Sequence, residues 1–223
     1  MIALLPMKGH SERVPGKNIK ILNGKPLFFH IADTLKNSNL FDYLVINTDS
    51  EEIANLALER YHNWAQINER PKELHGDFVS MNSIIEYDLN QMESQSIFFQ
   101  THSTNPLLTI DTIKNAIFKF ETLQKDKNID SLFSVNLIKT RLYNNNLIPI
   151  NHNPEYLQRT QDLENVYEEN SNFYIFTKDS FKKNKRRIGS NPEIFIMGRN
   201  SIESIDIDDK SDWELVENIL AHK

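Results

Sequence analysis

Two aspartates near the C-terminus are spaced so that they could bind a divalent cation. Asp206 and Asp208 alternate with Ile205 and Ile207 in the sequence Ser-Ile-Asp-Ile-Asp. In an extended strand both carboxylates would lie on one face, about 6 to 7 Å apart, while the isoleucines enter the core. Carboxylates at that spacing repel unless a cation lies between them, and Mg²⁺ binds a few carboxylates together with water and phosphate oxygens. The pattern alone also fits an edge strand with an acidic, solvent-facing side.

A second group of residues suits an anionic polyphosphate. The segment 7–18 reads MKGHSERVPGKN and combines Gly9 and Gly16 with three basic side chains, Lys8, Arg13 and Lys17. Glycine lets backbone N–H groups turn toward anionic oxygens, lysines balance the charge, and arginine can bind two oxygens at once. A solvated basic surface loop would have the same composition.

The common phosphate-binding motifs are absent from this segment. Six residues separate Gly9 from Gly16, and Asn18 follows Lys17, whereas a Walker A loop has four residues between its glycines and then Lys and Ser or Thr. The spacing G-x-G-x-x-G does not occur here either. The sequence therefore argues against a P-loop NTPase and a dinucleotide-dependent dehydrogenase.

Short apolar runs alternate with amphipathic segments, as expected for an α/β fold with a mostly parallel sheet. In such sheets ligands collect at the carboxyl ends of the strands, where segment 7–18 lies. The predicted strands are Ile2–Leu5, Tyr43–Asn47, Ser96–Gln100, Ser131–Leu137, Asn172–Phe176 and Glu193–Met197. The predicted helices are Pro26–Lys36, Glu51–Arg60, Ile110–Leu123 and Asp212–Ala221, the last one starting with a capping box formed by Ser211 and Glu214.

Composition excludes several classes of protein. The 223 residues carry 25 Lys plus Arg against 31 Asp plus Glu, a net charge of −6, which disfavours a nucleic-acid-binding module. The absence of cysteine excludes disulfides, thiolate metal sites and a cysteine nucleophile. No apolar run is long enough to span a membrane, and the first residues lack the basic flank of a signal peptide, so we expect an unexported, cytoplasmic protein. We expect a single domain over residues 1–223, with a projecting segment rich in Asn and Pro at about 139–160.

The sequence S-x-R-x-P-G-K-N at 11–18, followed by Asn-Gly-Lys-Pro-Leu at 23–27, resembles the N-terminal signature of the CMP-sialic acid synthetases and the related CMP-Kdo synthetases. This resemblance implies a three-layer α/β/α fold of the nucleotide-diphospho-sugar transferase type. It also implies that Lys8, Arg13 and Lys17 hold the triphosphate of CTP, and that Gly9, Ser11 and Asn18 contribute to the nucleotide site. Lys8 departs from the family, which often has arginine there.

Two further segments resemble the nucleotide site of this family. Residues 47–53 are similar to its S-T-D-D-E-E-I segment, although the residues of Thr48–Ser50, taken one by one, favour a helix N-cap over a ligand contact. Residues 70–80 resemble a stretch that lies near the cytosine and ribose. The resemblance assigns nucleotide contacts there to Arg70, Asp77 and Ser80.

The sugar side of the site shows more departures. His102, Thr104 and Asn105 stand in a segment similar to the family's Q-P-T-S-P-L, with histidine in place of the glutamine and Leu108 in place of a frequent arginine. An ordinary loop histidine hydrogen-bonded to its neighbours is the alternative for His102. Residues 159–162 and 170–174 are similar to R-R-Q-D and N-G-A-x-Y, with Thr160 replacing the second arginine. The resemblance assigns sugar contacts there to Arg159, Gln161, Asn170 and Tyr174, and implies a homodimer in which the segment before them reaches the neighbouring subunit.

The resemblance extends from Ala3 to about Leu220 and includes a metal-binding D-I-D that matches Asp206 and Asp208. It implies Mg²⁺-dependent attack of the anomeric hydroxyl of an acidic 2-keto-3-deoxy sugar on the α-phosphorus of CTP, giving a CMP-sugar and pyrophosphate. CTP, an acidic sugar and a second copy of the chain are the expected partners. Two alternatives remain: a nucleotidyltransferase of the same fold that uses Kdo or another sugar, and a non-catalytic nucleotide-sugar-binding relative.

Overall fold

The computed structural model describes residues 1–92, 97–198 and 201–222. Seven strands form the main sheet in the order β5-β4-β1-β6-β8-β7-β9, and all neighbouring pairs are parallel except the two that β8 makes with β6 and β7. The mostly parallel sheet is therefore confirmed. The strands are β1 (Ile2–Leu4), β4 (Leu44–Thr48), β5 (Ala65–Glu69), β6 (Ile97–Thr101), β7 (Ser131–Ile138), β8 (Val166–Thr177) and β9 (Pro192–Met197), and a separate hairpin pairs β2 (Ile21–Leu22) with β3 (Lys25–Pro26).

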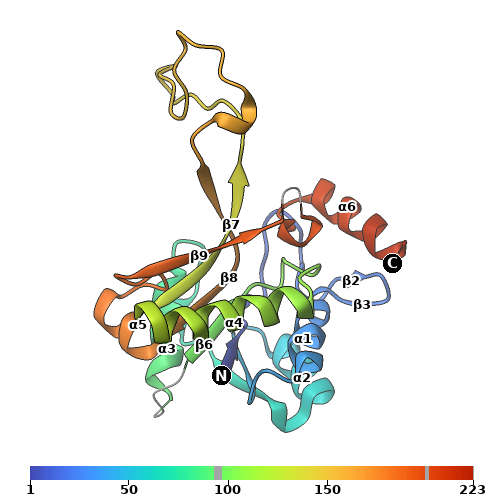
Figure 1. Ribbon diagram of the computed structural model, residues 1–223. Coiled ribbons are helices and arrows are strands. Elements are labelled where there is room, and N and C mark those ends of the chain that lie inside the picture. The colour runs from blue at the N-terminus through green and yellow to red at the C-terminus, as the bar shows by residue number, and fades with distance from the viewer. Residues whose placement is uncertain (93–96, 199–200, 223) are drawn as a thin grey trace.

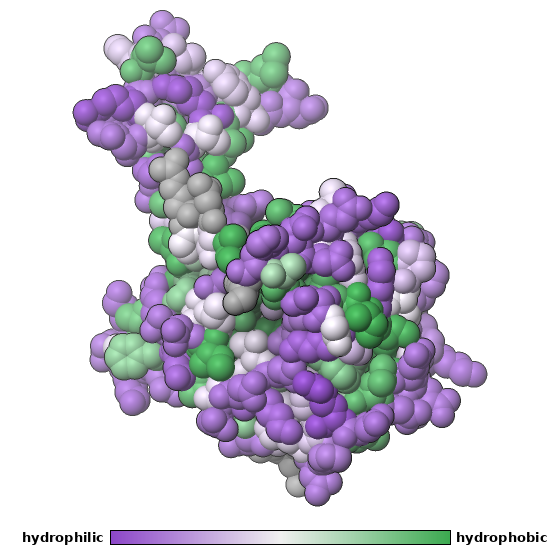
Figure 2. Space-filling view, turned by 90° about the vertical axis from the view of Figure 1, so that its right-hand side faces the viewer, coloured by the Kyte–Doolittle hydropathy of each residue, from purple (hydrophilic) through white to green (hydrophobic). Residues whose placement is uncertain are grey.

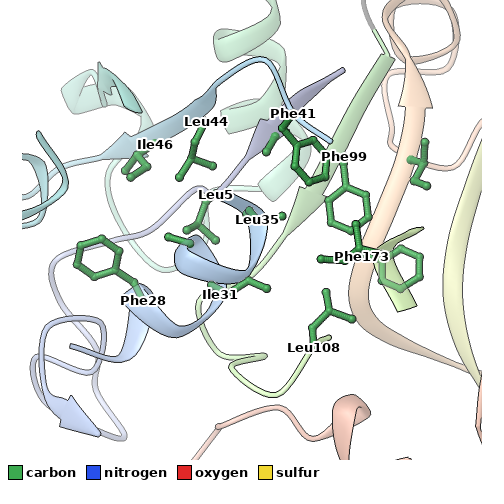
Figure 3. Packing of buried hydrophobic residues seen from close by; sticks show 14 of the residues in the cluster. Leu5, Phe28, Ile31, Leu35, Phe41, Leu44, Ile46, Phe99, Leu108 and Phe173 are labelled. Carbon is green, nitrogen blue, oxygen red and sulfur yellow. The ribbon is translucent and has the colours of Figure 1, made fainter. Parts of the chain in front are cut away.

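Helices cover both faces of the sheet, which confirms the three-layer α/β/α architecture (Figure 1). On one face α1 (Leu27–Ser38), α2 (Glu51–Tyr61) and α4 (Ile110–Lys127) bury the larger apolar cluster. Figure 3 shows Ile31 and Leu35 of α1 among side chains of the strands, including Leu44 and Phe99. On the other face α3 (Met81–Asn90) and α5 (Lys178–Asn184) bury the smaller one. This burial stabilises the carboxyl ends of the central strands, where the candidate site lies.

The last helix, α6 (Lys210–Ala221), packs beside the body rather than on the sheet. Its Trp213 and Val216 join Leu27 and Ile207 in a third apolar cluster. The predicted capping box of Ser211 and Glu214 is wrong. The carboxylate of Asp209 caps the helix by accepting from the backbone N–H of Asp212, and the Asp212 carboxylate accepts from the Asp209 N–H. Asp209 and Asp212, which stand two residues before the predicted Ser211 and Glu214, thus satisfy the free amides at this terminus. Each carboxylate can accept hydrogen bonds from two N–H groups.

The segment with the aspartate pair forms no strand, contrary to its predicted extended pairing. Residues 202–204 form a 3-10 turn and 205–208 run as irregular backbone, tied down by a 2.9 Å hydrogen bond from the Ile207 N–H to the Thr104 carbonyl. The prediction that the two isoleucines enter the core is confirmed, because Ile205 and Ile207 both pack in the third apolar cluster. Burial of the isoleucines, rather than a ladder of strand hydrogen bonds, fixes the position of the aspartates.

Most of the predicted elements are observed, with ends that differ by a few residues. The predicted start of one strand, Ser96, lies outside the described residues. The prediction missed β5, α3 and α5. The edge strand β5 has only one fully buried residue, so it lacks a continuous apolar run, and α5 has only seven residues. Short 3-10 turns complete the fold at His62–Trp64, Lys72–Leu74, Thr160–Asp162 and Ile202–Ser204.

The chain between β7 and β8 projects from the body as an arm, residues 139–165 (Figure 1). Inside the arm Tyr143 and Pro149 form an isolated antiparallel bridge, and the Asn151 amide donates to the Thr140 carbonyl at 2.8 Å. Apolar side chains reach the surface of the arm in Figure 2. In the described part of the chain, no helix combines the length and the apolar character needed to cross a membrane.

Candidate active site

A pocket of about 350 Å³ opens at the carboxyl ends of β1, β5 and β6. The loop after β1 forms one side of it, and the segments after β5 and β6 close the other. This is the place where parallel α/β sheets collect ligands. Its lining residues are Pro6, Met7, Lys8, His10, Ser11, Glu12, Arg13, Lys17, Asn18, Arg70, Asp77, Met81, His102, Ser103 and Thr104.

Hydrogen bonds hold the loop after β1 over the sheet. The Gly9 N–H donates to the Asp49 carboxylate at 2.6 Å, and a Cβ at Gly9 would lie only 2.8 Å from the Cβ of Ser50. The Asn18 amide donates to the Lys8 carbonyl at 2.8 Å. Ser50 also caps α2 by accepting from the Ile53 N–H, which confirms the N-cap prediction. Close contact therefore requires glycine at position 9, and these hydrogen bonds tie the loop to the neighbouring segments.

Arg13 and Lys17, which line the pocket, also contact the aspartate segment, whose own residues are not among the lining ones. Arg13 forms an ion pair with Asp208 at 2.8 Å, and the Lys17 ammonium donates to the Ile207 carbonyl at 2.7 Å. Lys8 pairs with Asp77 on the opposite wall. Two segments nearly two hundred residues apart in sequence thus come together, which places positive and negative charge side by side in one site.

Burial shifts the pKa values of the inner groups. Desolvation raises the pKa of Asp206, against a hydrogen bond from Thr104 that lowers it, while the charge of Asp208 raises it further. Desolvation also lowers the pKa of Lys17, against the raising effect of both aspartates. Titratable groups whose pKa values are shifted by desolvation and by charged neighbours are typical of functional sites.

The donor set fits a magnesium ion that phosphate oxygens help to bind. The Asp206 Oδ1 atom is buried and has no hydrogen-bond partner among the described residues, so a cation there would satisfy it. Nowhere in the described ranges do three or more His, Cys, Asp or Glu side chains gather as a metal cluster. A site of two carboxylates agrees with the habit of Mg²⁺, which takes one or two from the protein and the rest from substrate and water. Asp212 is engaged as a helix cap.

Arg70 enters the pocket from a buried polar network that the sequence did not indicate. Its Nε donates to Asn47 Oδ1 at 2.7 Å, and its Nη2 donates to the Met7 carbonyl at 3.0 Å. The amides of Asn47 and Asn68 both donate to Asp88 Oδ1, at 2.7 and 2.8 Å. Asp88 on α3 therefore orients the residues that hold the Arg70 guanidinium.

The Asp88 carboxyl gives a testable pH dependence of stability. Burial raises its pKa from 3.8 to about 6, against the lowering effect of the Asn68 and Asn47 hydrogen bonds. Because the folded-state pKa of Asp88 is raised, its neutral carboxyl contributes fully to the free energy of unfolding below about pH 4. This contribution is lost as the pH rises to about 6 and the carboxyl ionises. Asp88→Asn keeps an accepting Oδ1 and stays neutral. Relative to the wild type, its free energy of unfolding is expected to gain on the order of 2 to 3 kcal/mol between those pH values.

Urea unfolding between pH 4 and 8 measures this difference. The exposed Asp126→Asn is the matched control, and its difference from the wild type is expected to stay small throughout. A constant difference between Asp88→Asn and the wild type over the whole range would contradict the raised pKa.

The structure brings nine of the predicted site residues to the lining of the pocket: Lys8, Ser11, Arg13, Lys17, Asn18, Arg70, Asp77, His102 and Thr104. Others lie just behind it. Gly9 donates its backbone N–H to Asp49, and Ser80 is the N-cap of α3. The Asn105 amide donates to the Ile205 carbonyl at 3.4 Å. The buried Leu108 belongs to the main core and does not line the pocket.

The predicted sugar residues further along the chain lie outside this pocket. Arg159 and Gln161 stand on the arm, where Arg159 pairs with Asp162 at 2.6 Å. Asn170 accepts from Ser134 at 2.6 Å. Tyr174 is buried on β8 and donates its hydroxyl to Glu169. One chain therefore does not bring Arg159 to the pocket at the carboxyl ends of β1, β5 and β6.

A second cavity of about 430 Å³ lies next to α3, and the sequence did not indicate it. It is lined by Tyr174, Glu169, Asn82 and the segment 186–190, which includes Arg186 and Arg187. Met81 lines the first pocket and Asn82 the second, so the two are neighbours at the start of α3. Because Arg187 belongs to a lysine- and arginine-rich run, its sequence context resembles an exposed surface.

The chain is similar to curated enzymes over nearly its whole length. It is 28% identical to a pseudaminic acid cytidylyltransferase from Campylobacter jejuni, over 92% of this chain and 90% of that protein. It is 27% identical to a CMP-N,N'-diacetyllegionaminic acid synthase from Legionella pneumophila, over 99% of this chain and 96% of that one.

Solved structures share the fold at low sequence identity. A CMP:2-keto-3-deoxy-manno-octonic acid synthetase complexed with CTP superposes with a TM-score of 0.68 and 13% identity, covering 99% of this chain and 98% of that one. A 4-diphosphocytidyl-2C-methyl-D-erythritol synthase from Anaerococcus prevotii gives a TM-score of 0.69 at 12% identity, with the same coverage. The cytidylyltransferase family model matches residues 2–220. The chain is thus an enzyme of the cytidylyltransferase family.

Proposed function

We propose that this enzyme activates an acidic 2-keto-3-deoxy sugar, a sialic acid or a related nonulosonic acid, by forming a CMP-sugar and pyrophosphate from CTP. The observation that carries the proposal is the meeting of the basic loop with Asp206 and Asp208 beside one pocket. The names of the relatives support the substrate class, since pseudaminic and legionaminic acid enzymes are among them. A Kdo-activating enzyme is the alternative, supported by the fold of the structure that binds CTP.

The basic loop would bind the triphosphate. Lys8, Arg13 and Lys17 line the same pocket and supply positive charge for the β- and γ-phosphates. Arg13 pairs with Asp208 without a ligand, so phosphate oxygens would compete for a guanidinium that is already positioned. Arg70 would contact the nucleotide from the pocket wall, and the network that holds its guanidinium supports this role.

Asp206 and Asp208 would hold Mg²⁺, with phosphate oxygens completing its shell. The chemistry that such an ion supplies is neutralisation of charge on the α-phosphate and a lower pKa for the attacking hydroxyl. The protein's own contribution is to desolvate Asp206 and to leave its Oδ1 free. The fixed isoleucines on either side of Asp206 keep the carboxylate in place without a strand.

Chemically, the anomeric hydroxyl of the sugar attacks the α-phosphorus of CTP while pyrophosphate leaves from the opposite side. This step requires in-line positioning and neutralised charge, and it needs no covalent enzyme intermediate. Lys17 reaches from the basic loop to the backbone of the aspartate segment, where its ammonium would offset charge on the α-phosphate and the leaving group. We assign no serine nucleophile and no histidine base.

We also propose that the enzyme is a homodimer in which the arm covers the partner's sugar site. Large apolar side chains are exposed on the arm, among them Leu147, Ile148, Tyr156 and Leu157. Arg159 and Gln161 stand on the same arm, away from the pocket of their own chain. A second copy would cover this apolar surface and receive these polar side chains.

Leu157→Asp is expected to weaken dimerisation about a hundredfold. Leu157 is 91% exposed in the single chain, and burial of one leucine from each copy is worth about 3 kcal/mol in total. Sedimentation velocity over a concentration series measures the shift toward monomer. Phe118→Asp on α4, which is 72% exposed and away from the arm, is the matched control. A monomeric wild type, or an unchanged dimer in Leu157→Asp, would contradict the proposal.

Pyrophosphate release with Mg²⁺, each nucleoside triphosphate and a panel of nonulosonic acids plus Kdo tests the function. Release with CTP and one nonulosonic acid is the expected result and names the substrate. Release with Kdo alone would favour the alternative. CTP binding without release for any sugar would support a non-catalytic nucleotide-sugar-binding protein.

A further inference from the structure

Three polar side chains that the proposed function leaves unexplained connect the two cavities. Arg187 lines the second cavity, and its Nη1 donates to Gln100 Oε1 at 2.6 Å. The guanidinium also lies 3.8 Å from the centroid of the Tyr174 ring. Gln100 on β6 is fully buried, and its amide nitrogen lies 3.1 Å from Nε2 of His102, which lines the first pocket. The chain of contacts is therefore Arg187, Gln100, His102.

The contacts fix the orientation of the Gln100 amide. A guanidinium can only donate, so the atom that faces Arg187 must be the amide oxygen. The amide nitrogen donates one hydrogen to the Thr101 carbonyl at 2.8 Å, which agrees with the same orientation. Its second hydrogen is then directed at His102, and a buried N–H without an acceptor would be costly.

The proton on His102 follows from this orientation. Because Gln100 donates to Nε2, that nitrogen must accept, and a neutral imidazole then carries its proton on Nδ1. Burial lowers the pKa of His102 to about 3, helped by the positive charges of Arg187 and Lys17, so the ring is neutral near pH 7. Among the residues described, none forms a hydrogen bond with Nδ1.

We propose that Arg187 is a positioning residue which, through Gln100, holds His102 as the Nδ1–H tautomer, and that this N–H recognises an acceptor oxygen of the acidic sugar. The proposal rests on the proposed function for the identity of the ligand. A sugar with a carbonyl, carboxylate or ether oxygen at that place would be bound. A sugar that presents an ammonium group there would leave two donors facing each other and lose about tenfold to a hundredfold in kcat/KM.

The tautomer can be measured without any substrate. In protein labelled with ¹⁵N-histidine, the His102 signals are identified by their loss in His102→Gln, and their shifts show which nitrogen carries the proton. We expect Nδ1–H in the wild type. Gln100→Glu keeps an acceptor for Arg187 but cannot donate, so Nε2 of His102 is expected to gain a proton. A wild-type ring protonated on Nε2 would overturn the proposal.

Kinetics separate positioning from general stability. Arg187→Met keeps the apolar stem and frees the Gln100 amide to rotate, so KM for the sugar acid is expected to rise about tenfold while KM for CTP stays within about twofold. Lys183→Met, on the exposed side of α5, removes the same charge and is expected to change neither the tautomer nor either KM. If Arg187→Met fails to fold, Gln100→Glu supplies the same comparison.

The outcomes distinguish this proposal from the proposed function. An Arg187→Met enzyme with an unchanged His102 tautomer and an unchanged KM for the sugar acid would overturn the positioning role. If the wild type shows Nδ1–H but no sugar acid supports pyrophosphate release, the proposed function and sugar recognition by His102 both fail. The positioning of His102 by Arg187 would stand in that case.

Discussion

Asp206→Asn is expected to lower kcat about a thousandfold or more while the protein stays folded, on the order of 4 kcal/mol of transition-state stabilisation. Asparagine removes a charged ligand from the proposed magnesium site. The Asp206 carboxylate interacts with Thr104, but its Oδ1 atom has no hydrogen-bond partner among the described residues, which leaves that oxygen available to a cation. Pyrophosphate release over a magnesium titration measures the effect.

The same variant is expected to be at least as stable as the wild type when no metal is added. Burial raises the pKa of Asp206, which means that the ionised carboxylate destabilises the fold at neutral pH, and a neutral amide removes this cost. The exposed Asp126→Asn should leave both turnover and stability unchanged. An active Asp206→Asn enzyme would remove Asp206 from the metal site, and an inactive one that has lost its fold would show that Asp206 is structural.

Lys17→Met is expected to lower kcat/KM for CTP about a hundredfold, close to 3 kcal/mol. The Lys17 ammonium is half-buried, donates to the Ile207 carbonyl, and is close enough to both aspartates to feel their charge. Methionine keeps the length and the apolar stem but removes the charge that would offset the phosphates. Steady-state kinetics with CTP as the varied substrate measure the loss.

Lys114→Met is the matched control for Lys17, because Lys114 is exposed on α4 and lines no described cavity. Its kinetics should match the wild type. Burial also lowers the pKa of Lys17, so the wild type should lose activity at high pH earlier than an ordinary lysine would predict. Unchanged kcat/KM in Lys17→Met would remove Lys17 from the phosphate site.

Most of the fold was predictable because its strands and helices bury continuous or regularly spaced apolar residues. The runs at β1 and β4 are buried on both faces, and α4 repeats Ile113, Ile117 and Phe120 on its inner side. The strand β5 could not be predicted in this way, because it lies at the sheet edge with mostly polar or half-exposed side chains.

The candidate site was predictable where one short segment carries the pattern, and less so where the fold assembles it. The basic loop and the aspartate pair were found from spacing and resemblance, and the structure brings them together through Arg13 and Asp208. The strand predicted for the aspartates was wrong, because alternating isoleucines can be buried by irregular backbone as well as by a strand. The spacing of apolar residues in the sequence indicates which side chains are buried together. It does not indicate which hydrogen bonds the backbone makes.

Residues that act through other residues had no local signal. Asp88 supports Arg70 through Asn47, which is 41 residues away in sequence, and Arg187 meets Gln100 across a separation of 87 residues. Neither pair belongs to a motif. The contacts exist because α3 packs against β4 on one face of the sheet, and the segment after α5 contacts β6 through Arg187.

The fate of the α-phosphorus of CTP tests the central claim most directly. ³¹P NMR of a reaction with CTP, Mg²⁺ and the nonulosonic acid selected by pyrophosphate release should show the α-phosphorus in a phosphodiester bound to the sugar, with one pyrophosphate formed for each CMP-sugar. Conversion of CTP to free CMP without a bond to the sugar, or no consumption of CTP with any acidic sugar, would contradict the proposed function.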